Sequence, residues 1–210
     1  MTAMTTTSES SDTELLRQMQ AGTAAAFAAL YRRHQGPLYR FALLRCGSGD
    51  TAADVVQEAF MALMTGRLGY DPLRGQLQHF LFGVARNLIL KLEEPQRRQV
   101  ALAEPSEDGD GDGEADLDPD QACSAQEPLG RLLENEAAEQ VRRALALLPP
   151  HYRDPVILYE LHDLSYQEIA AICQVDIGTV RSRLARGRAA LARRLKALHP
   201  AAHAVAHSAA

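Results

Sequence analysis

Apolar residues recur at helical spacing in two long segments of the chain, near residues 14–98 and 129–198. Neither segment shows the strict alternation of apolar and polar residues, bounded by turn signals, that is typical of strands. The pattern therefore predicts an all-α protein of two small helical bundles. The expected core positions of the first bundle are Leu15, Leu16, Met19, Phe27, Leu30, Leu38, Phe41, Leu44, Val55, Val56, Ala59, Phe60 and Leu63.

Breaks in the first segment are predicted from glycine and proline. Gly36–Pro37 and Gly47–Gly49 interrupt the apolar pattern, and either Asp50 or Thr51 is a candidate cap for the helix that follows. Residues 66–76 are expected to form a loop because of their Gly and Pro content. A strongly apolar helix is predicted to begin after this loop.

The second segment has clear helix boundaries. A helix over residues 132–148 should stop at Pro149–Pro150, and the next helix passes through residues 156–161. Ser165 and Glu168 then form the capping-box pair that opens a short third helix.

A basic helix is expected from about Gly178 to Leu198, after a short break with Asp176 as candidate N-cap. A short helix, a tight turn and a basic amphipathic helix are typical of a helix-turn-helix, whose second helix enters the major groove of DNA. At 100° per residue, one stripe faces the core: Val180, Leu184, Leu191 and Leu195. The candidate DNA-binding residues on the remaining faces are Thr179, Arg181, Ser182, Arg183 and Arg186.

The alternative for this helix is a merely solvated Arg-rich surface. Such a surface is expected to carry interspersed Glu at i,i+4 spacing. Residues 179–198 hold seven basic side chains and no acidic one, which favours contact with DNA.

The net charge of -5 hides a strong segregation of charge. Ten acidic residues and no Lys or Arg lie in 99–130, so the rest of the chain has 22 basic and 17 acidic residues. This acidic tract is also rich in Gly and poor in apolar residues, a composition that cannot offset its ordering entropy by burial. It predicts a flexible acidic linker between the two bundles.

The expected organisation has five parts. They are a disordered tail (1–13), a first helical domain (14–98), the acidic linker (99–128), a helix-turn-helix domain (129–198) and an Ala/His tail (199–210).

Several other classes of function find no support. No apolar run reaches the about 18 residues of a membrane helix, and phosphate-loop, HExxH and nucleophile-elbow motifs are missing. The Asp-rich tract 108–116 lacks the closing Glu of a calcium loop, and the spaced tail histidines have no carboxylate or thiolate beside them. Cys46, Cys123 and Cys173 show no paired metal spacing and suit a reducing cytoplasm. We expect a cytoplasmic protein with no enzyme activity, cofactor, metal or membrane insertion.

Motifs in both segments resemble the extracytoplasmic-function sigma factors. SYQEIAAICQVDIGTVRSRLARGRAAL is similar to the promoter-reading helix-turn-helix of region 4 in that family. AFAALYRRHQGPLYRFALLRCG, DVVQEAFMALM and FLFGVARNLI resemble region 2. The resemblance implies an alternative bacterial sigma factor that binds core RNA polymerase and recognises the -35 and -10 promoter elements. It would start transcription of a stress- or signal-specific regulon.

The resemblance also implies partners and sites. The contact with polymerase would involve the clamp of the β′ subunit and the β flap, and an anti-sigma factor would cover the same surfaces. The polymerase-binding residues would be Asp54, Gln57, Glu58 and Phe60, which offer acidic and amide groups beside an apolar anchor. An amphipathic helix that faces only its own core would explain Phe60 but not the polar residues on one side.

Contact with -10 DNA is placed by the resemblance on residues 66–76 and the helix after them. Unpaired bases are held by stacking and by hydrogen bonds to their edges in a basic setting. The residues that supply such groups are Tyr70, Arg74, Gln76, His79, Arg86 and Asn87.

The chain departs from the family pattern at two places. Met64 and Phe80 stand where the family commonly has Trp, and Pro95 is expected to end its helix early. These departures bear on the strength and sequence preference of the -10 contact. A rival hypothesis from another class of function also stays open: a stand-alone helix-turn-helix regulator whose N-terminal bundle senses a ligand or forms a dimer.

Overall fold

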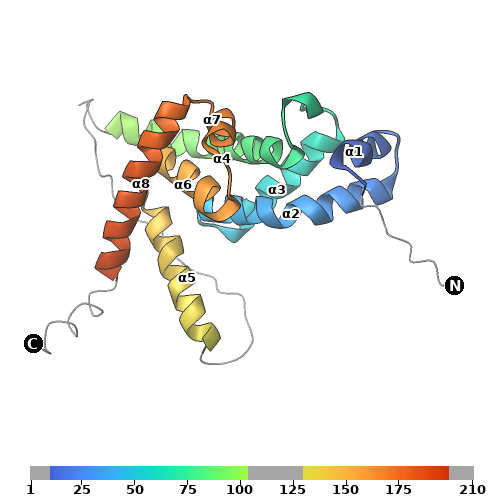
Figure 1. The fold of residues 1–210 in the computed structure, drawn as a ribbon. Helices are drawn as coiled ribbons and strands as arrows, with labels where there is room; N and C mark the ends of the chain where they lie inside the picture. The colour runs from blue at the N-terminus through green and yellow to red at the C-terminus, as the bar shows by residue number, and fades with distance from the viewer. Residues whose placement is uncertain (1–9, 104–129, 199–210) are drawn as a thin grey trace, which may run out of the picture.

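The computed structural model describes residues 10–103 and 130–198 (Figure 1). Both ranges are helical apart from short connections, and neither contains a strand, so the predicted all-α class is confirmed. The predictions for the N-terminal tail, for most of the acidic linker and for the Ala/His tail lie outside the described residues. Within 10–103 and 130–198, no helix combines the length and apolar character needed to cross a membrane.

The first module consists of four α-helices and one short 3₁₀ turn. These are α1 (Asp12–Gln20), α2 (Ala24–Cys46), α3 (Gly49–Met64), η1 (Pro72–Arg74) and α4 (Leu77–Ala103). The long helices α2, α3 and α4 pack on one another through the predicted apolar stripes, and α1 packs on α2. All the predicted core positions are buried or packed against the buried core.

Two helix breaks predicted from proline are wrong. Helix α2 runs without interruption through Gly36–Pro37, and α4 continues past Pro95. Proline is tolerated inside a helix when the flanking turns are held by other contacts, because the cost is one lost hydrogen bond and a local bend. Leu38 is buried directly after Pro37, and Glu93 is tied to Arg45 just before Pro95.

The cap of α3 also differs from the prediction. The N-cap is Ser48, whose Oγ accepts a hydrogen bond from the backbone N–H of Thr51 at 3.3 Å. Gly47 takes the left-handed conformation, with φ 75°, that ends α2. Because the chain turns back at Gly47, the first free side-chain oxygen in position to cap α3 is that of Ser48, ahead of Asp50.

The second module is formed by α5 (Gly130–Ala146), α6 (Pro150–His162), α7 (Tyr166–Cys173) and α8 (Ile177–Leu198). The predicted stop before Pro150 is confirmed, since α5 ends at Ala146 and Pro150 opens α6.

The predicted helix-turn-helix is present in α7 and α8. Ser165 and Glu168 form both hydrogen bonds of the capping box at the start of α7. Gln174 ends α7 in the left-handed conformation, with φ 57°, and α8 begins directly after Asp176. The four predicted residues of the apolar stripe of α8 face inward: Val180 and Leu184 are buried, and Leu191 and Leu195 are half-buried.

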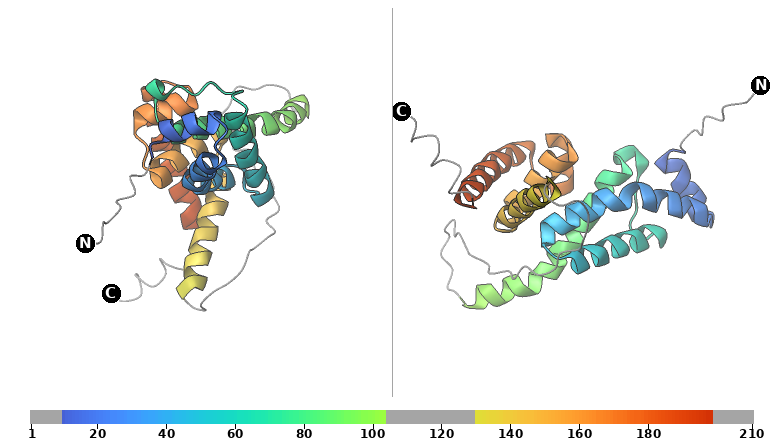
Figure 2. Two further views of the ribbon diagram at one scale, coloured as in Figure 1. Left: turned by 90° about the vertical axis from the view of Figure 1, so that its right-hand side faces the viewer. Right: turned by 90° about the horizontal axis from the view of Figure 1, so that it is seen from below.

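The two modules pack against each other and share one hydrophobic core. Helix α2 contacts α5 and α6, and Figure 2 shows the yellow α5 beside the blue α2. Helix α4 contacts α7, which lies next to it in Figure 1. At the end of α6 the His162 ring lies 4.6 Å from the Phe82 ring and 6.4 Å from the Phe41 ring. The sequence predicted two bundles joined by a linker, and it contained no prediction of this contact between them.

Candidate nucleic-acid and protein interfaces

Helix α8 presents polar side chains to solvent. Of the five predicted DNA-binding residues, three are exposed (Arg181, Ser182 and Arg186) and two are half-buried (Thr179 and Arg183). The Arg181 guanidinium lies over the Tyr166 ring, 5.9 Å from its centre, and the Ser182 hydroxyl donates to the Thr179 carbonyl at 3.0 Å. The first turns of α8 therefore offer a compact polar and cationic surface.

The opposite side of α8 is fixed against α6 at one close crossing. A Cβ on Gly187 would lie 2.8 Å from Val156 Cγ2 and 3.3 Å from the Tyr152 carbonyl oxygen, so only glycine allows this approach. Beside the crossing, Arg188 pairs with Glu160 at 2.5 Å. This packing holds the basic face of α8 outward.

The loop before α4 is held by its own side chains. The Tyr70 hydroxyl donates to the Gly75 carbonyl at 2.9 Å, and the Tyr70 ring packs on Phe80 with 5.3 Å between ring centres. The Asp71 carboxylate accepts from the Leu73 backbone N–H at 3.0 Å and so starts the 3₁₀ turn. Tyr70, predicted as a DNA contact, has a structural role in shaping the loop.

The tip of the loop is displayed to solvent. Leu73 is 95% exposed, and the neighbouring Arg74 and Gln76 are exposed as well. Sequence reasoning singled out Arg74 and Gln76 but missed Leu73, although an apolar residue between Pro72 and Arg74 in a Gly-rich loop has no core to enter.

The -10 candidates on α4 have a different setting. The His79 ring Nδ1 lies 3.6 Å from a carboxylate oxygen of Glu168, and Arg86 Nε donates to Asp154 Oδ2 at 2.8 Å. Burial lowers the pKa of His79, and the charge of Glu168 opposes that shift. Asn87, by contrast, is exposed. Two of the six predicted -10 residues therefore face the second module instead of solvent.

Helix α3 separates a polar surface from a buried one. Asp54, Gln57 and Glu58 are exposed, as the hypothesis of a polymerase contact requires. Phe60 is 2% exposed and packs against Tyr31 and Phe27, with ring centres 4.9 and 6.2 Å away. Phe60 therefore belongs to the core and reaches a partner only as the floor of a groove.

That groove, of about 520 Å³, lies between α2 and α3. Its rim carries exposed apolar side chains that sequence reasoning missed as contact candidates: Met61 is 49% exposed and Met64 53%. Tyr39 of α2 faces them across the groove. Flexible methionine side chains beside polar groups are typical of surfaces that bind another helix.

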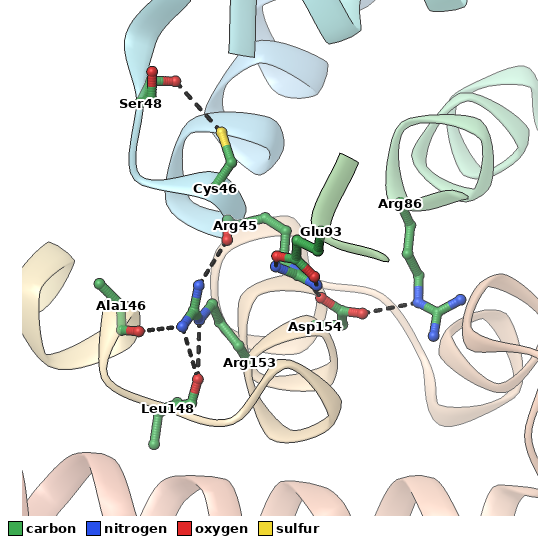
Figure 3. A network of polar contacts seen from close by, with 9 residues as sticks. All are labelled: Arg45, Cys46, Ser48, Arg86, Glu93, Ala146, Leu148, Arg153 and Asp154. Atoms are coloured by element: carbon green, nitrogen blue, oxygen red, sulfur yellow. Dashed lines mark hydrogen bonds and ion pairs between the residues drawn. The ribbon is translucent and has the colours of Figure 1, made fainter. Parts of the chain in front are cut away.

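A buried ionic network joins the two modules (Figure 3). Arg45 of α2 is fully buried and pairs with Glu93 of α4 and with Asp154 of α6. Asp154, 1% exposed, also accepts the hydrogen bond from Arg86. Burial alone would lower the pKa of Arg45, but Glu93 and Asp154 raise it above its ordinary value. One carboxylate thus ties α6 to both α2 and α4.

Arg153 binds the ends of two helices at the same junction. It donates to the carbonyl of Ala146, the last residue of α5, to the carbonyl of Leu148 just after it, and to the Arg45 carbonyl at the end of α2 at 2.7 Å. A cation is favoured there because helix C-termini carry partial negative charge. Burial, together with the charge of Arg45, lowers the pKa of Arg153 to about 10, so it stays protonated at neutral pH.

Sequence reasoning missed this network, although one signal was available. Arg45 follows Phe41 by four residues and Leu38 by seven, which places a charged residue on the apolar stripe of α2. Asp154 stands directly before an apolar run, residues 155–158. The spacing could have identified both as buried charges, but their pairing needs the fold.

Two family models match the chain: Sigma-70 region 2 over residues 30–98, and Sigma-70, region 4 over residues 138–191. The chain is 32% identical over 190 residues to the ECF RNA polymerase sigma-E factor of Escherichia coli, covering 89% of this chain and 95% of that protein. It is 31% identical over 189 residues to the ECF RNA polymerase sigma factor SigM of Mycobacterium tuberculosis, covering 89% and 86%. The chain belongs to the extracytoplasmic-function RNA polymerase sigma factors.

Another relative, the ECF RNA polymerase sigma factor SigE of Mycolicibacterium smegmatis, is 32% identical over 159 residues. That match covers 76% of this chain but only 57% of the length of SigE. Among solved structures, the sigma factor RpoE in complex with the anti-sigma factor NepR from Bartonella quintana is 25% identical, with a TM-score of 0.58. That match covers 81% of this chain and 96% of RpoE. CnrH in complex with the cytosolic domain of CnrY is 22% identical, with a TM-score of 0.60 over 90% and 99% of the two chains, and supports the fold.

Matches to both regions decide between the two hypotheses for the chain. Region 2 corresponds to α2–α4 and region 4 to α5–α8, in the predicted order. A stand-alone helix-turn-helix regulator would account for region 4 alone. The sigma factor is thus an alternative sigma factor of transcription initiation, and the rival hypothesis is not favoured.

Proposed function

We propose that this sigma factor acts in the cytoplasm, where it binds core RNA polymerase and brings it to promoters with specific -35 and -10 elements. The observation that carries the proposal is the presence of three separate exposed surfaces. They are the polar face of α3, the loop before α4 with Asn87, and the cationic face of α8. Each suits a different contact, and the mechanism is positional.

The polymerase contact is proposed for α3 and the groove beside it. Asp54, Gln57 and Glu58 supply a polar rim, and Met61 and Met64 supply exposed apolar area. An apolar centre with a polar rim is the usual composition of a protein interface. By the family resemblance, the partner is the clamp of the β′ subunit.

The -35 contact is proposed for the start of α8. Arginine donates two parallel hydrogen bonds to guanine in the major groove, and small hydroxyl side chains reach phosphate. Arg181 and Arg186 are exposed in the N-terminal half of α8, with Ser182 between them in the sequence. Region 4 would also contact the β flap.

The -10 contact is proposed for the loop tip and α4. Arg74 and Gln76 are exposed next to the apolar Leu73, which suits capture of an unstacked base. His79 and Arg86 complete the proposed surface only when the second module does not cover them. Tyr70 contributes by holding the loop.

An anti-sigma factor is proposed as the second protein partner. A solved sigma factor that is 25% identical to this chain, RpoE, is in complex with the anti-sigma factor NepR. The apolar groove between α2 and α3 overlaps the proposed polymerase surface at Gln57. A protein that fills this groove would compete with polymerase.

The polymerase contact is tested by co-elution with purified core polymerase. Gln57→Ala and Glu58→Ala should each reduce the bound fraction, because their side chains are exposed on α3. Gln20→Ala is the matched control: Gln20 is also exposed at a helix surface, on α1, and does not line the groove. Wild-type levels of bound protein for both α3 variants would show that the interface lies elsewhere.

A further inference from the structure

Two tyrosine rings lie between two arginines in the second module. The Tyr159 ring of α6 and the Tyr166 ring of α7 are 5.3 Å apart, centre to centre, and tilted by 34°. The Arg181 guanidinium lies over the Tyr166 ring, 5.9 Å from its centre. At the other end, the Arg188 guanidinium lies over the Tyr159 ring at 4.7 Å. These four side chains from α6, α7 and α8 form one row, the arginine–tyrosine stack.

The backbone around the stack is anchored on each helix. Arg181 and Arg188 are seven residues apart on α8 and therefore lie on the same face of that helix. Tyr166 is the first residue of α7, directly after the capping box that closes the turn in front of it. The close crossing at Gly187 holds α8 against α6. The position of each ring relative to α8 thus follows from the fold of the module.

The two ends of the stack differ in their polar contacts. Arg188 also pairs with the Glu160 carboxylate at 2.5 Å, and this hydrogen bond raises the pKa of Arg188. Within residues 10–103 and 130–198, no carboxylate pairs with Arg181. A guanidinium on a ring uses its flat face, and its N–H donors at the edge stay available to other partners. Arg188 is therefore the closed end of the stack, and Arg181 is the open end.

The ring under Arg181 limits the directions that its guanidinium takes. Arg181 is exposed, so without the ring its long side chain would adopt many rotamers in water. Fixing such a side chain on a partner weakens binding by about two- to tenfold, because its rotamer freedom is lost. The contact with Tyr166 lies within the about 6 Å over which a ring attracts a cation. Part of the ordering of Arg181 is therefore complete before any DNA is bound.

We propose that Tyr166 is a positioning residue for the -35 contact: its ring holds the Arg181 guanidinium in the direction from which Arg181 binds DNA. This inference deepens the proposed function and rests on Arg181 as a DNA contact. It adds a side chain from the first helix of the helix-turn-helix to recognition of the -35 element. Tyr166 acts through Arg181, so its effect disappears when Arg181 is absent.

The test uses the full chain bound to core polymerase. The probes are a duplex promoter that the wild-type complex selects from genomic fragments and all single-base changes of that duplex across the -35 element. Competition binding gives the relative affinity for each duplex. In this assay, Arg181→Ala distinguishes the two possible targets of Arg181: a loss confined to one base pair assigns a base, and a uniform loss assigns a phosphate.

Tyr166→Leu removes the ring and keeps an apolar side chain. We expect it to lower the affinity by about two- to tenfold, with the same dependence on the duplex as Arg181→Ala. Tyr166→Phe keeps the ring and should bind as the wild type does. In the Arg181→Ala background, Tyr166→Leu should cause no further loss, because two residues that act through one contact are not additive.

Arg188→Ala is the matched control for Arg181→Ala. It removes an equal charge from the same face of α8, at the closed end of the stack, and leaves both rings in place. Its effect should be independent of the duplex sequence and additive with that of Tyr166→Leu. If Tyr166→Leu is coupled to Arg188→Ala as strongly as to Arg181→Ala, the ring has no specific role toward Arg181 and the inference is overturned.

Urea denaturation followed by circular dichroism shows which variants are folded. If Tyr166→Leu is not, Tyr166→Gln takes its place, since Tyr166 is half-buried at the start of a helix, and the expected loss is the same. An unchanged affinity in the folded variant would overturn the positioning role. So would a higher affinity, because the ring would then hold Arg181 away from DNA.

The proposed function and the positioning role fail in different ways. If Arg181→Ala binds every duplex as tightly as the wild type, Arg181 is not a -35 contact, and the inference falls together with that contact. If Arg181→Ala weakens binding and the folded Tyr166→Leu variant does not, the -35 contact stands and only the positioning role of Tyr166 is wrong.

Discussion

Replacing Phe60 with alanine tests whether α3 keeps its stabilising residues apart from its binding residues. Phe60 is 2% exposed and lies in an aromatic cluster with Tyr31 and Phe27. An aromatic side chain buries about 150 to 250 Å². At about 25 cal/mol per Å² this corresponds to about 4 to 6 kcal/mol, an upper value because the unfolded chain is partly compact.

The expected loss in free energy of unfolding is therefore about 3 to 5 kcal/mol, the range found for buried Phe-to-Ala changes. Urea denaturation followed by circular dichroism at 222 nm measures it. The midpoint should fall while the slope stays unchanged, because the surface exposed on unfolding is nearly the same.

Gln57→Ala provides the comparison on the same helix. Gln57 is exposed, so its removal should change the free energy of unfolding by less than about 0.5 kcal/mol while reducing polymerase binding. A loss below about 1 kcal/mol for Phe60→Ala would show that the ring is not packed as described. The division of α3 into a core face and a contact face would then be wrong.

Three further predictions address α8 and the module contact. Arg186→Ala should weaken binding to -35 DNA by about 1 to 3 kcal/mol in a shift assay, without reducing polymerase binding. If the variant binds all promoter variants with the same affinity as the wild type, Arg186 is not a contact residue. Gly187→Leu should lower the free energy of unfolding by about 1 to 3 kcal/mol or more, because no space exists beside Val156, and an unchanged melting temperature would contradict that packing. Burial, together with the charge of Arg40, lowers the pKa of His162 to about 4, against 6.5 when unfolded. The contribution of neutral His162 to the free energy of unfolding is present above pH 6.5 and is lost as the pH falls toward 4. Between pH 7 and pH 5, the free energy of unfolding of the wild type should therefore fall by about 1 kcal/mol more than that of His162→Gln, a value that allows for the partial exposure of the ring.

Local elements were predictable because their signals are local. The Ser165–Glu168 capping box and the apolar stripe of α8 depend on spacing within one or two turns. The resemblance of the motifs to a known family predicts where the candidate contact surfaces lie. Gln57 and Glu58 are exposed, as a contact surface on α3 requires. The DNA and polymerase contacts themselves stay predictions.

The errors have a common physical origin. Because proline lacks an N–H, the sequence predicts helix breaks at Pro37 and Pro95, yet α2 and α4 continue through them. The distant Arg45–Glu93 pair holds α4 just before Pro95. The pairing of Arg86 with Asp154 joins residues 68 positions apart, which periodicity cannot reveal. Both the continuity of these helices and the contact between the modules thus depend on tertiary contacts, within one module and between the two, that the sequence pattern does not contain.

Run-off transcription with purified core polymerase tests the central claim most directly. Core enzyme alone should give no specific transcripts from genomic promoter fragments, whereas core enzyme with this protein should start discrete transcripts. Arg186→Ala should reduce them from promoters that depend on the -35 element, with core binding unaltered. The proposed function would be contradicted if the protein is folded and bound to core polymerase but gives no specific transcript from any of a full set of genomic fragments.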